Sequence, residues 1–152
     1  MIHIFYRHYN ISGNDFKSRP NWFDYKKCFI SLLDTIKDKN VKLHVIFDGN
    51  VESNFINQYK DKFILHEIKA GNDQSSFFQT WKIAKNTPME LNDLVYFVEN
   101  DYLHVNGWVG KITELFSTYK LLHYVSLYDH NDKYFLPMYE DLVSKIFVTE
   151  NH

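Results

Sequence analysis

Short apolar runs alternate along the chain with longer segments in which apolar residues recur every three or four positions. The first pattern is typical of buried strands, and the second of one face of an amphipathic helix. The apolar runs predict strands at Ile2–Tyr6, Val41–Phe47, Phe63–Ile68, Val95–Val98, His123–Tyr128 and Val143–Val148. The periodic segments predict helices that follow Pro20 and that span Glu52–Tyr59, Ser75–Lys85 and Val105–Ser117.

This alternation predicts the fold class, an α/β domain with three layers. Strands that are joined through helices run mostly parallel, and the helices cover both faces of the central sheet. We expect Val95–Val98 to lie inside this sheet and not at its edge, because the run is apolar throughout. No low-complexity segment, proline- or glycine-rich linker or internal repeat interrupts the pattern, so residues 1–152 are expected to form a single domain.

Composition and charge narrow the class of protein. A hydrophobic content of 45% and a charged content of 24% are typical of a globular chain, and the net charge of −2 offers no basic surface to nucleic acid. Cys28 is the only cysteine, which excludes an intrachain disulfide and fits a reducing compartment. The sequence shows neither the pattern of a signal peptide nor a transmembrane segment, so we expect a cytoplasmic protein.

Polar side chains follow the predicted strands at the ends where parallel sheets bind ligands. They are Arg7, His8 and Tyr9 after the first strand, Asp48 after the second, Asn72, Ser75 and Ser76 after the third, Glu99 and Asp101 after the fourth, and Asp129 after the fifth. Each group also has a simpler interpretation, because Asp-Gly-Asn is a common turn, a serine often caps a helix, and an isolated histidine is usually not a ligand. Their recurrence at successive strand ends favours a ligand site.

The pair Glu99-x-Asp101 is the most informative of these groups. Residues two apart in a strand point to the same side, so both carboxylates face one small volume. Two carboxylates without cysteine favour a hard cation such as Mg²⁺ or Mn²⁺, which binds through one or two carboxylates and the phosphates of a substrate. The alternative is that Asp101 caps the following helix, a position for which Asn106 is equally suited.

The order of these segments resembles a GT-A-type glycosyltransferase domain, similar to the large inverting family 2 group. The resemblance covers about residues 2–130 and rests on HVIFDGN, GNDQSSFFQTWKIA, VYFVENDYLH and VNGWVGKITELF. VYFVENDYLH corresponds to an apolar strand that closes in an Asp-x-Asp-like metal motif. The resemblance implies a nucleoside-diphosphate-sugar donor, with a UDP-sugar favoured, and a carbohydrate or glycan acceptor.

The resemblance also implies roles for individual residues. Asp48 would recognise the base or ribose, Arg7, His8 and Tyr9 would surround the base and phosphates, and Asn72, Ser75 and Ser76 would line the donor pocket. Asp101 would bind Mn²⁺ or Mg²⁺, and Glu99 would contact the ribose or a metal-bound water. Asp129, with His130, is the candidate base for the acceptor hydroxyl in an inverting transfer.

Two departures from the family pattern keep other functions open. Glu99 stands where the motif usually has aspartate, and family members usually continue beyond a strand like Lys145–Val148. A shortened domain that binds a nucleotide sugar without turnover is therefore one alternative. Another metal-dependent phosphatase or nucleotidyltransferase is a weaker one, because Arg7–Asn10 is not glycine-rich and the first strand is not followed by Asp-x-Asp.

Overall fold

The computed structural model describes residues 1–9, 19–37 and 39–127 of the 152-residue chain. The chain divides into two compact units, 1–105 and 106–152. The predicted strand Val143–Val148 and the candidate base Asp129 lie outside the described residues. The expectation of a single domain over 1–152 stays a prediction.

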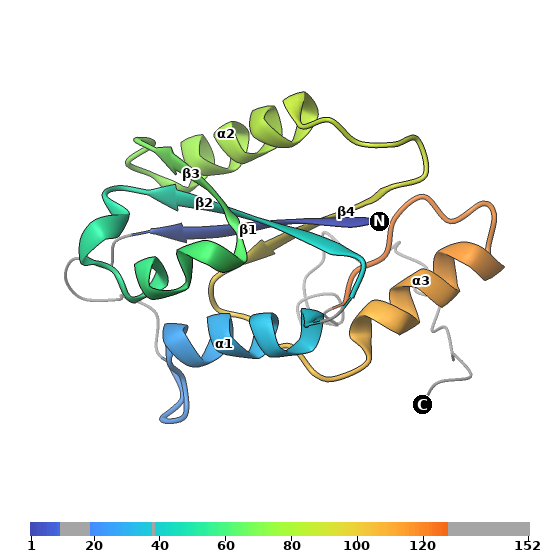
Figure 1. The fold of residues 1–152 in the computed structure, drawn as a ribbon, viewed down its shortest axis with the longest axis horizontal. Helices are drawn as coiled ribbons and strands as arrows, with labels where there is room; N and C mark the ends of the chain where they lie inside the picture. Colours follow the sequence, from blue (N-terminus) through green and yellow to red (C-terminus); the bar gives the residue numbers. More distant parts are fainter. Residues whose placement is uncertain (10–18, 38, 128–152) are drawn as a thin grey trace, which may run out of the picture. The chain divides into compact units, whose positions relative to one another are not determined.

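The first unit is built on a four-stranded sheet in the order β3-β2-β1-β4, in which all neighbouring strands are parallel (Figure 1). The strands are β1 (Ile2–Tyr9), β2 (Val41–Asp48), β3 (Ile64–Ile68) and β4 (Leu94–Glu99). The predicted α/β class with a parallel sheet is thus confirmed. The strand order reverses between β1 and β4, because β2 and β3 extend the sheet on one side of β1 and β4 lies on the other. A reversal of this kind opens a crevice at the carboxyl ends of the strands.

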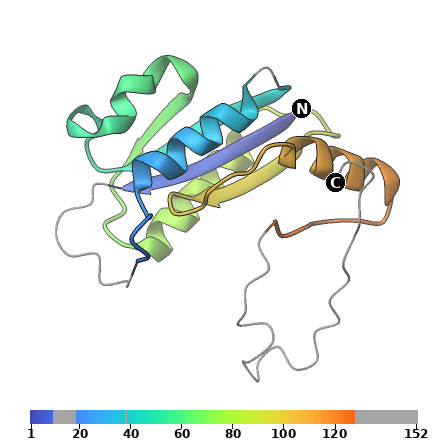
Figure 2. The same ribbon diagram turned by 90° about the horizontal axis from the view of Figure 1, so that it is seen from below.

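Helices cover both faces of this sheet, as the alternation predicted. The helix α2 (Asp73–Asn86) lies on one face, and α1 (Tyr25–Ile36) and the 3₁₀ helix η2 (Phe55–Lys62) lie on the other (Figures 1 and 2). Between β3 and β4 the chain crosses back over the sheet to the far side of β1, and the connecting helix α2 lies on the opposite face from α1. A right-handed crossover requires the opposite face when the connection runs back across the sheet.

The core has one layer on each face of the sheet. On the α2 face, Phe5, Ile46 and Ile68 pack with Ala84 of the helix. On the α1 face, Tyr6 packs against Phe29 with ring centroids 5.2 Å apart. Because β1 and β2 are buried on both faces over most of their length, their sequences are mainly apolar and do not alternate strictly with polar residues.

Two predicted helices differ from expectation: one begins later than predicted, and the other is divided into two 3₁₀ segments. The helix expected after Pro20 begins at Tyr25, because the Asp24 side chain accepts a hydrogen bond from the backbone N–H of Lys26 and caps it. The predicted helix Glu52–Tyr59 is instead two 3₁₀ segments, η1 (Val51–Ser53) and η2. Each segment starts at an asparagine whose side chain accepts a backbone N–H, which divides the element in two.

The position of β4 differs from the prediction. Within the described ranges β4 pairs with β1 alone and lies at the edge of the sheet, where the sequence predicted an interior strand. Val95 and Phe97 are 45% and 41% exposed, while Val98 on the opposite face is buried. Apolar composition predicted burial on both faces, but only one face of β4 is covered. The predicted strand His123–Tyr128 has no regular secondary structure in its described part, 123–127.

The described part of the second unit contains α3 (Trp108–Thr118), close to the predicted helix Val105–Ser117. It begins after Gly107, which has a φ of 87° and makes no side-chain capping bond. The buried side chains Trp108, Val109, Ile112 and Leu115 recur at helical spacing on one face. No helix in the described ranges is long and apolar enough to cross a membrane.

Candidate functional site

A cavity of about 520 Å³ lies at the carboxyl ends of the strands, where the strand order reverses. This volume is within the range of small-molecule sites. The predicted residues that line it are Arg7, His8, Tyr9, Asp48, Asn72, Ser76, Glu99 and Asp101. They come from the ends of β1, β2 and β4 and from the start of α2. Residues that are far apart in sequence, and that were selected because they follow strands, thus line one cavity.

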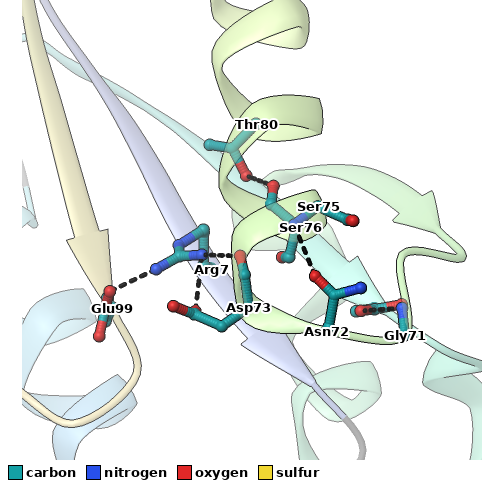
Figure 3. Close-up of polar contacts among 9 residues, drawn as sticks. Arg7, Gly71, Asn72, Asp73, Ser75, Ser76, Thr80 and Glu99 are labelled. Atoms are coloured by element: carbon teal, nitrogen blue, oxygen red, sulfur yellow. Dashed lines mark hydrogen bonds and ion pairs between the residues drawn. The ribbon is translucent and has the colours of Figure 1, made fainter.

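Arg7 connects three elements at the cavity wall. Its guanidinium donates to the Glu99 carboxylate on β4, and to both the Oδ1 and the backbone oxygen of Asp73 on α2 at 3.0 and 3.1 Å (Figure 3). Arg7 and Glu99 are directly opposite in the β1–β4 register. Arg7 was predicted to follow the first strand, but it lies inside β1, as do His8 and Tyr9. The longer strand places its side chain in line with Glu99.

Asp101 forms a second ion pair, with Arg19. The Nη1 of Arg19 lies 3.0 Å from Oδ2 of Asp101, and the two side chains are 23% and 16% exposed. Asp101 is not the cap of the following helix, because α3 begins at Trp108 and its N-cap is Gly107, which makes no side-chain capping bond. The purely structural interpretation of Asp101 as a helix cap is therefore wrong.

His8 is buried in the wall and is held by Asn100. The Nδ2 of Asn100 lies 3.0 Å from Nδ1 of His8, so Nε2 carries the proton of the neutral ring. Burial lowers the pKa of His8 to about 4, so the imidazole is neutral at pH 7. Nε2 is buried without a hydrogen-bond partner in the described part of the chain. His8 and Asn100 thus join β1 to the segment that carries both carboxylates.

The first turn of α2 forms another side of the cavity. Asn72 is the N-cap of the helix, and its Oδ1 accepts the backbone N–H of Ser75 at 2.8 Å. The simpler interpretation of this loop as a capped helix start is correct, although the cap is Asn72 and not a serine. Ser76 lines the cavity, whereas Ser75 is not among the lining residues. The positive end of the helix dipole favours an anion at this side.

Asp48 holds the loop that leads into α2. Its two carboxylate oxygens accept the backbone N–H groups of Ala70 and Gly71 at 2.8 and 3.0 Å. Gly71 has a φ of 74°, a conformation that favours glycine. The described contacts of Asp48 are those of a residue that shapes the site, and the predicted contact with base or ribose stays a prediction.

We expect Asp48→Asn to lower the free energy of unfolding by about 1–2 kcal/mol, because an amide oxygen replaces one acceptor and an NH₂ group faces the other backbone N–H. Urea unfolding measures this change. The matched control is Asp61→Asn, since Asp61 is 70% exposed and pairs only with its neighbour Lys62 in the described structure. The control is expected to stay within about 0.5 kcal/mol of the wild type. Equal stability of the two variants would contradict the supporting role of Asp48.

Some lining residues were not predicted. Asp73 and Asn100 are neighbours in sequence of the predicted residues Asn72, Glu99 and Asp101, and they line the same cavity. Arg19 lies 82 residues from its partner Asp101, and no local pattern indicates the pair. Arg19 ends a polar stretch before Pro20, and its cationic side chain is the only signal for it in the sequence.

The residue types in the cavity fit a divalent cation that arrives with a phosphate ligand. The described residues include no cluster of three or more histidine, cysteine or acidic side chains that would hold a metal alone. β4 ends at Glu99, so Asp101 lies beyond the strand and the expectation that both carboxylates point to one side of a strand was wrong. Both residues nevertheless line the cavity and provide two carboxylates, which is the usual protein share of a Mg²⁺ or Mn²⁺ site completed by phosphate and water. The lining residues carry four carboxylates and two guanidinium groups. This excess of negative charge would repel a nucleoside diphosphate that came without a cation.

Comparisons with known proteins do not identify the chain, because no family model, no curated protein and no solved structure matches it. The fold and the cavity define the class: a parallel α/β domain with a polar cavity at the switch point of its sheet. Function is inferred from that geometry.

Proposed function

We propose that the chain is a metal-dependent glycosyltransferase that binds a nucleoside-diphosphate sugar and transfers the sugar to an acceptor hydroxyl with inversion. The observation that carries the proposal is the convergence of Arg7, Glu99 and Asp101 with the first turn of α2 on one cavity at the switch point. Parallel α/β sheets bind nucleotides at this place. The transfer chemistry itself rests on the resemblance of the sequence segments to GT-A domains.

In this proposal the diphosphate of the donor occupies the region between the arginines and α2. Arg7 and Arg19 supply fork-shaped donors that match phosphate oxygens, and the helix start adds a favourable dipole. Asp101 and Glu99 hold Mn²⁺ or Mg²⁺, and the bound cation would neutralise charge on the leaving nucleoside diphosphate. Tyr9, which is 43% exposed, and the loop held by Asp48 provide the side toward the base and ribose.

The proposal predicts that UDP, or else GDP, raises the melting temperature only when Mn²⁺ or Mg²⁺ is present. A ligand at a hundredfold excess over its dissociation constant adds about 2.7 kcal/mol. For a chain of this length the melting temperature should rise by about 5–10 °C. Thermal-shift measurements with each nucleoside diphosphate, with and without Mn²⁺, test this. Uridine is the matched control, because it has the base and ribose but no phosphate for the arginines and the cation.

An unchanged melting temperature with every combination of nucleotide and metal would refute the proposed donor.

Turnover separates the transferase from the alternative, a domain that binds nucleotide sugar without catalysis. Release of UDP from a UDP-sugar supports the enzyme, and tight binding without release supports the binding domain. The assignment of Asp129 as the base that deprotonates the acceptor belongs to the same proposal.

A further inference from the structure

Both carboxylates of Glu99-x-Asp101 are bound by an arginine, and the two arginines come from different parts of the unit. Arg7 lies within β1 and donates to Glu99. Arg19 lies before α1 and binds Asp101 with an N–O distance of 3.0 Å. Within the described structure the two oxygens that remain, one on each carboxylate, have no hydrogen-bond partner. The charges of the proposed cation ligands are therefore balanced by the two arginines in this structure.

Each guanidinium is also held against an aromatic ring. Arg7 lies over the ring of Phe77, 5.6 Å from its centroid, and Arg19 lies over Phe23 at 4.5 Å. The side chain of Arg7 is only 11% exposed. An arginine fixed by a ring and an ion pair is a preorganised donor, which loses less conformational entropy when it binds an anion. Both guanidinium groups line the cavity proposed for the diphosphate.

The same atoms are thus needed for two different pairings. A cation at Glu99 and Asp101 competes with the arginines for carboxylate oxygens, while a phosphate competes with the carboxylates for the guanidinium groups. Either ligand alone breaks the ion pair between an arginine and Glu99 or Asp101, and the displaced charged group keeps fewer partners, which is costly in a partly buried site. When both ligands bind together, every charge regains a partner.

We propose that Arg7 and Arg19 couple the binding of the divalent cation to that of the nucleoside diphosphate. In the free protein they neutralise Glu99 and Asp101, and on binding they transfer to phosphate oxygens while the cation takes the carboxylates. This inference rests on the proposed function. It adds that neither ligand binds tightly without the other. Such coupling is reciprocal, so the cation strengthens nucleotide binding by the same factor as the nucleotide strengthens cation binding.

Calorimetric titration of Arg7→Gln and Arg19→Gln tests the coupling, because each variant is expected to bind Mn²⁺ more tightly but UDP more weakly than the wild type. With Mn²⁺ alone, each variant should bind the ion about two- to fivefold more tightly than the wild type, since the competing guanidinium is gone. With UDP at saturating Mn²⁺, each variant should bind the nucleotide about tenfold more weakly, since a charged donor to phosphate is gone. Arg19 binds the other carboxylate, Asp101, so its variant tests the coupling at a second ion pair, whereas Arg7 also binds Asp73 of α2.

Lys69→Gln is the matched control, because it removes the same charge from an exposed position next to the loop of Ala70 and Gly71. It should bind Mn²⁺ and UDP like the wild type. Arginine variants that bind Mn²⁺ no better than the wild type, or a Lys69→Gln protein that gains as much, would overturn the coupling. If the wild type binds UDP or GDP with Mn²⁺ but the arginine variants do not show the expected changes, the coupling fails and the proposed function survives. If the wild type binds no nucleotide under any condition, both fail.

Discussion

Replacing Asp101 with asparagine should abolish the metal-dependent binding of UDP and leave the fold intact. Asparagine keeps the shape of the side chain but removes the negative charge that a hard cation requires. Loss of a direct ligand should weaken nucleotide binding at saturating Mn²⁺ by about a hundredfold or more, since even residues that merely orient a metal ligand contribute tenfold or more. Isothermal titration with UDP and Mn²⁺ measures the loss, and the melting temperature without ligand monitors the fold.

Two further variants rank the contributions within the same titration. Glu99→Gln should have a milder effect, because its proposed contact is with ribose or a metal-bound water. Asp48→Asn should weaken UDP binding at saturating Mn²⁺, because Asp48 holds the loop through Ala70 and Gly71. An Asp101→Asn protein that binds UDP and Mn²⁺ like the wild type would show that Asp101 serves only its ion pair with Arg19.

Acidification from pH 7.5 to 5.5 should destabilise the protein strongly, because several histidines are buried as neutral rings. Burial lowers the pKa of His8, His44 and His104 to about 4 in the folded chain, against about 6.5 in the unfolded chain. Below pH 6.5 the unfolded state takes up protons that the folded state does not, so stability is full above this pH and is lost as the pH falls toward 4. Each such group lowers the free energy of unfolding by about 1.4 kcal/mol at pH 5.5.

His44 provides the sharpest variant for this prediction. It stacks on Phe5, its Nε2 lies 3.4 Å from His3, and its Nδ1 lies 3.1 Å from His66. In the neutral chain His66 donates to His44, His44 to His3, and His3 to Asp93, so an added proton breaks a bond of this series. Asp93 stays ionised in this range, because the N-terminal ammonium lowers its pKa to about 2.

Urea unfolding at pH 7.5, 6.5 and 5.5 tests the histidine prediction. His44→Gln should lose about 1.4 kcal/mol less than the wild type between pH 7.5 and 5.5, since one buried titrating group is gone. His123, which is exposed, supplies the control His123→Gln, whose pH dependence should match that of the wild type. A wild-type free energy of unfolding that stays constant over this range would contradict neutral burial of these rings.

The parallel sheet was predictable because its strands leave a strong local signal. β1 and β2 are buried on both faces over most of their length and therefore contain mainly apolar residues without strict alternation. The rule that ligands bind at the carboxyl ends of parallel strands then selected residues such as Asp48 and Glu99 without knowledge of their contacts. Local sequence thus predicted which positions reach the cavity.

The partners of these residues were not predictable, because they depend on distant contacts. Arg19 gives no local sign that it will bind Asp101, and Asp48 reads equally as a turn residue or a ligand. The edge position of β4 likewise depends on which other strands are present, whereas the apolar run itself only predicts a strand. Pairing between segments is a property of the whole fold and not of the pattern along the chain.

The most direct test of the central claim is an anomalous-difference map from crystals grown with UDP and Mn²⁺. We expect one strong manganese peak beside the carboxylates of Glu99 and Asp101, with the diphosphate of UDP next to it and within reach of Arg7. The two ion pairs of Arg7 and Arg19 with these carboxylates should be opened in the same crystals. Nucleotide bound elsewhere on the chain, or manganese absent from these carboxylates while UDP occupies the cavity, would contradict the proposed metal-dependent site.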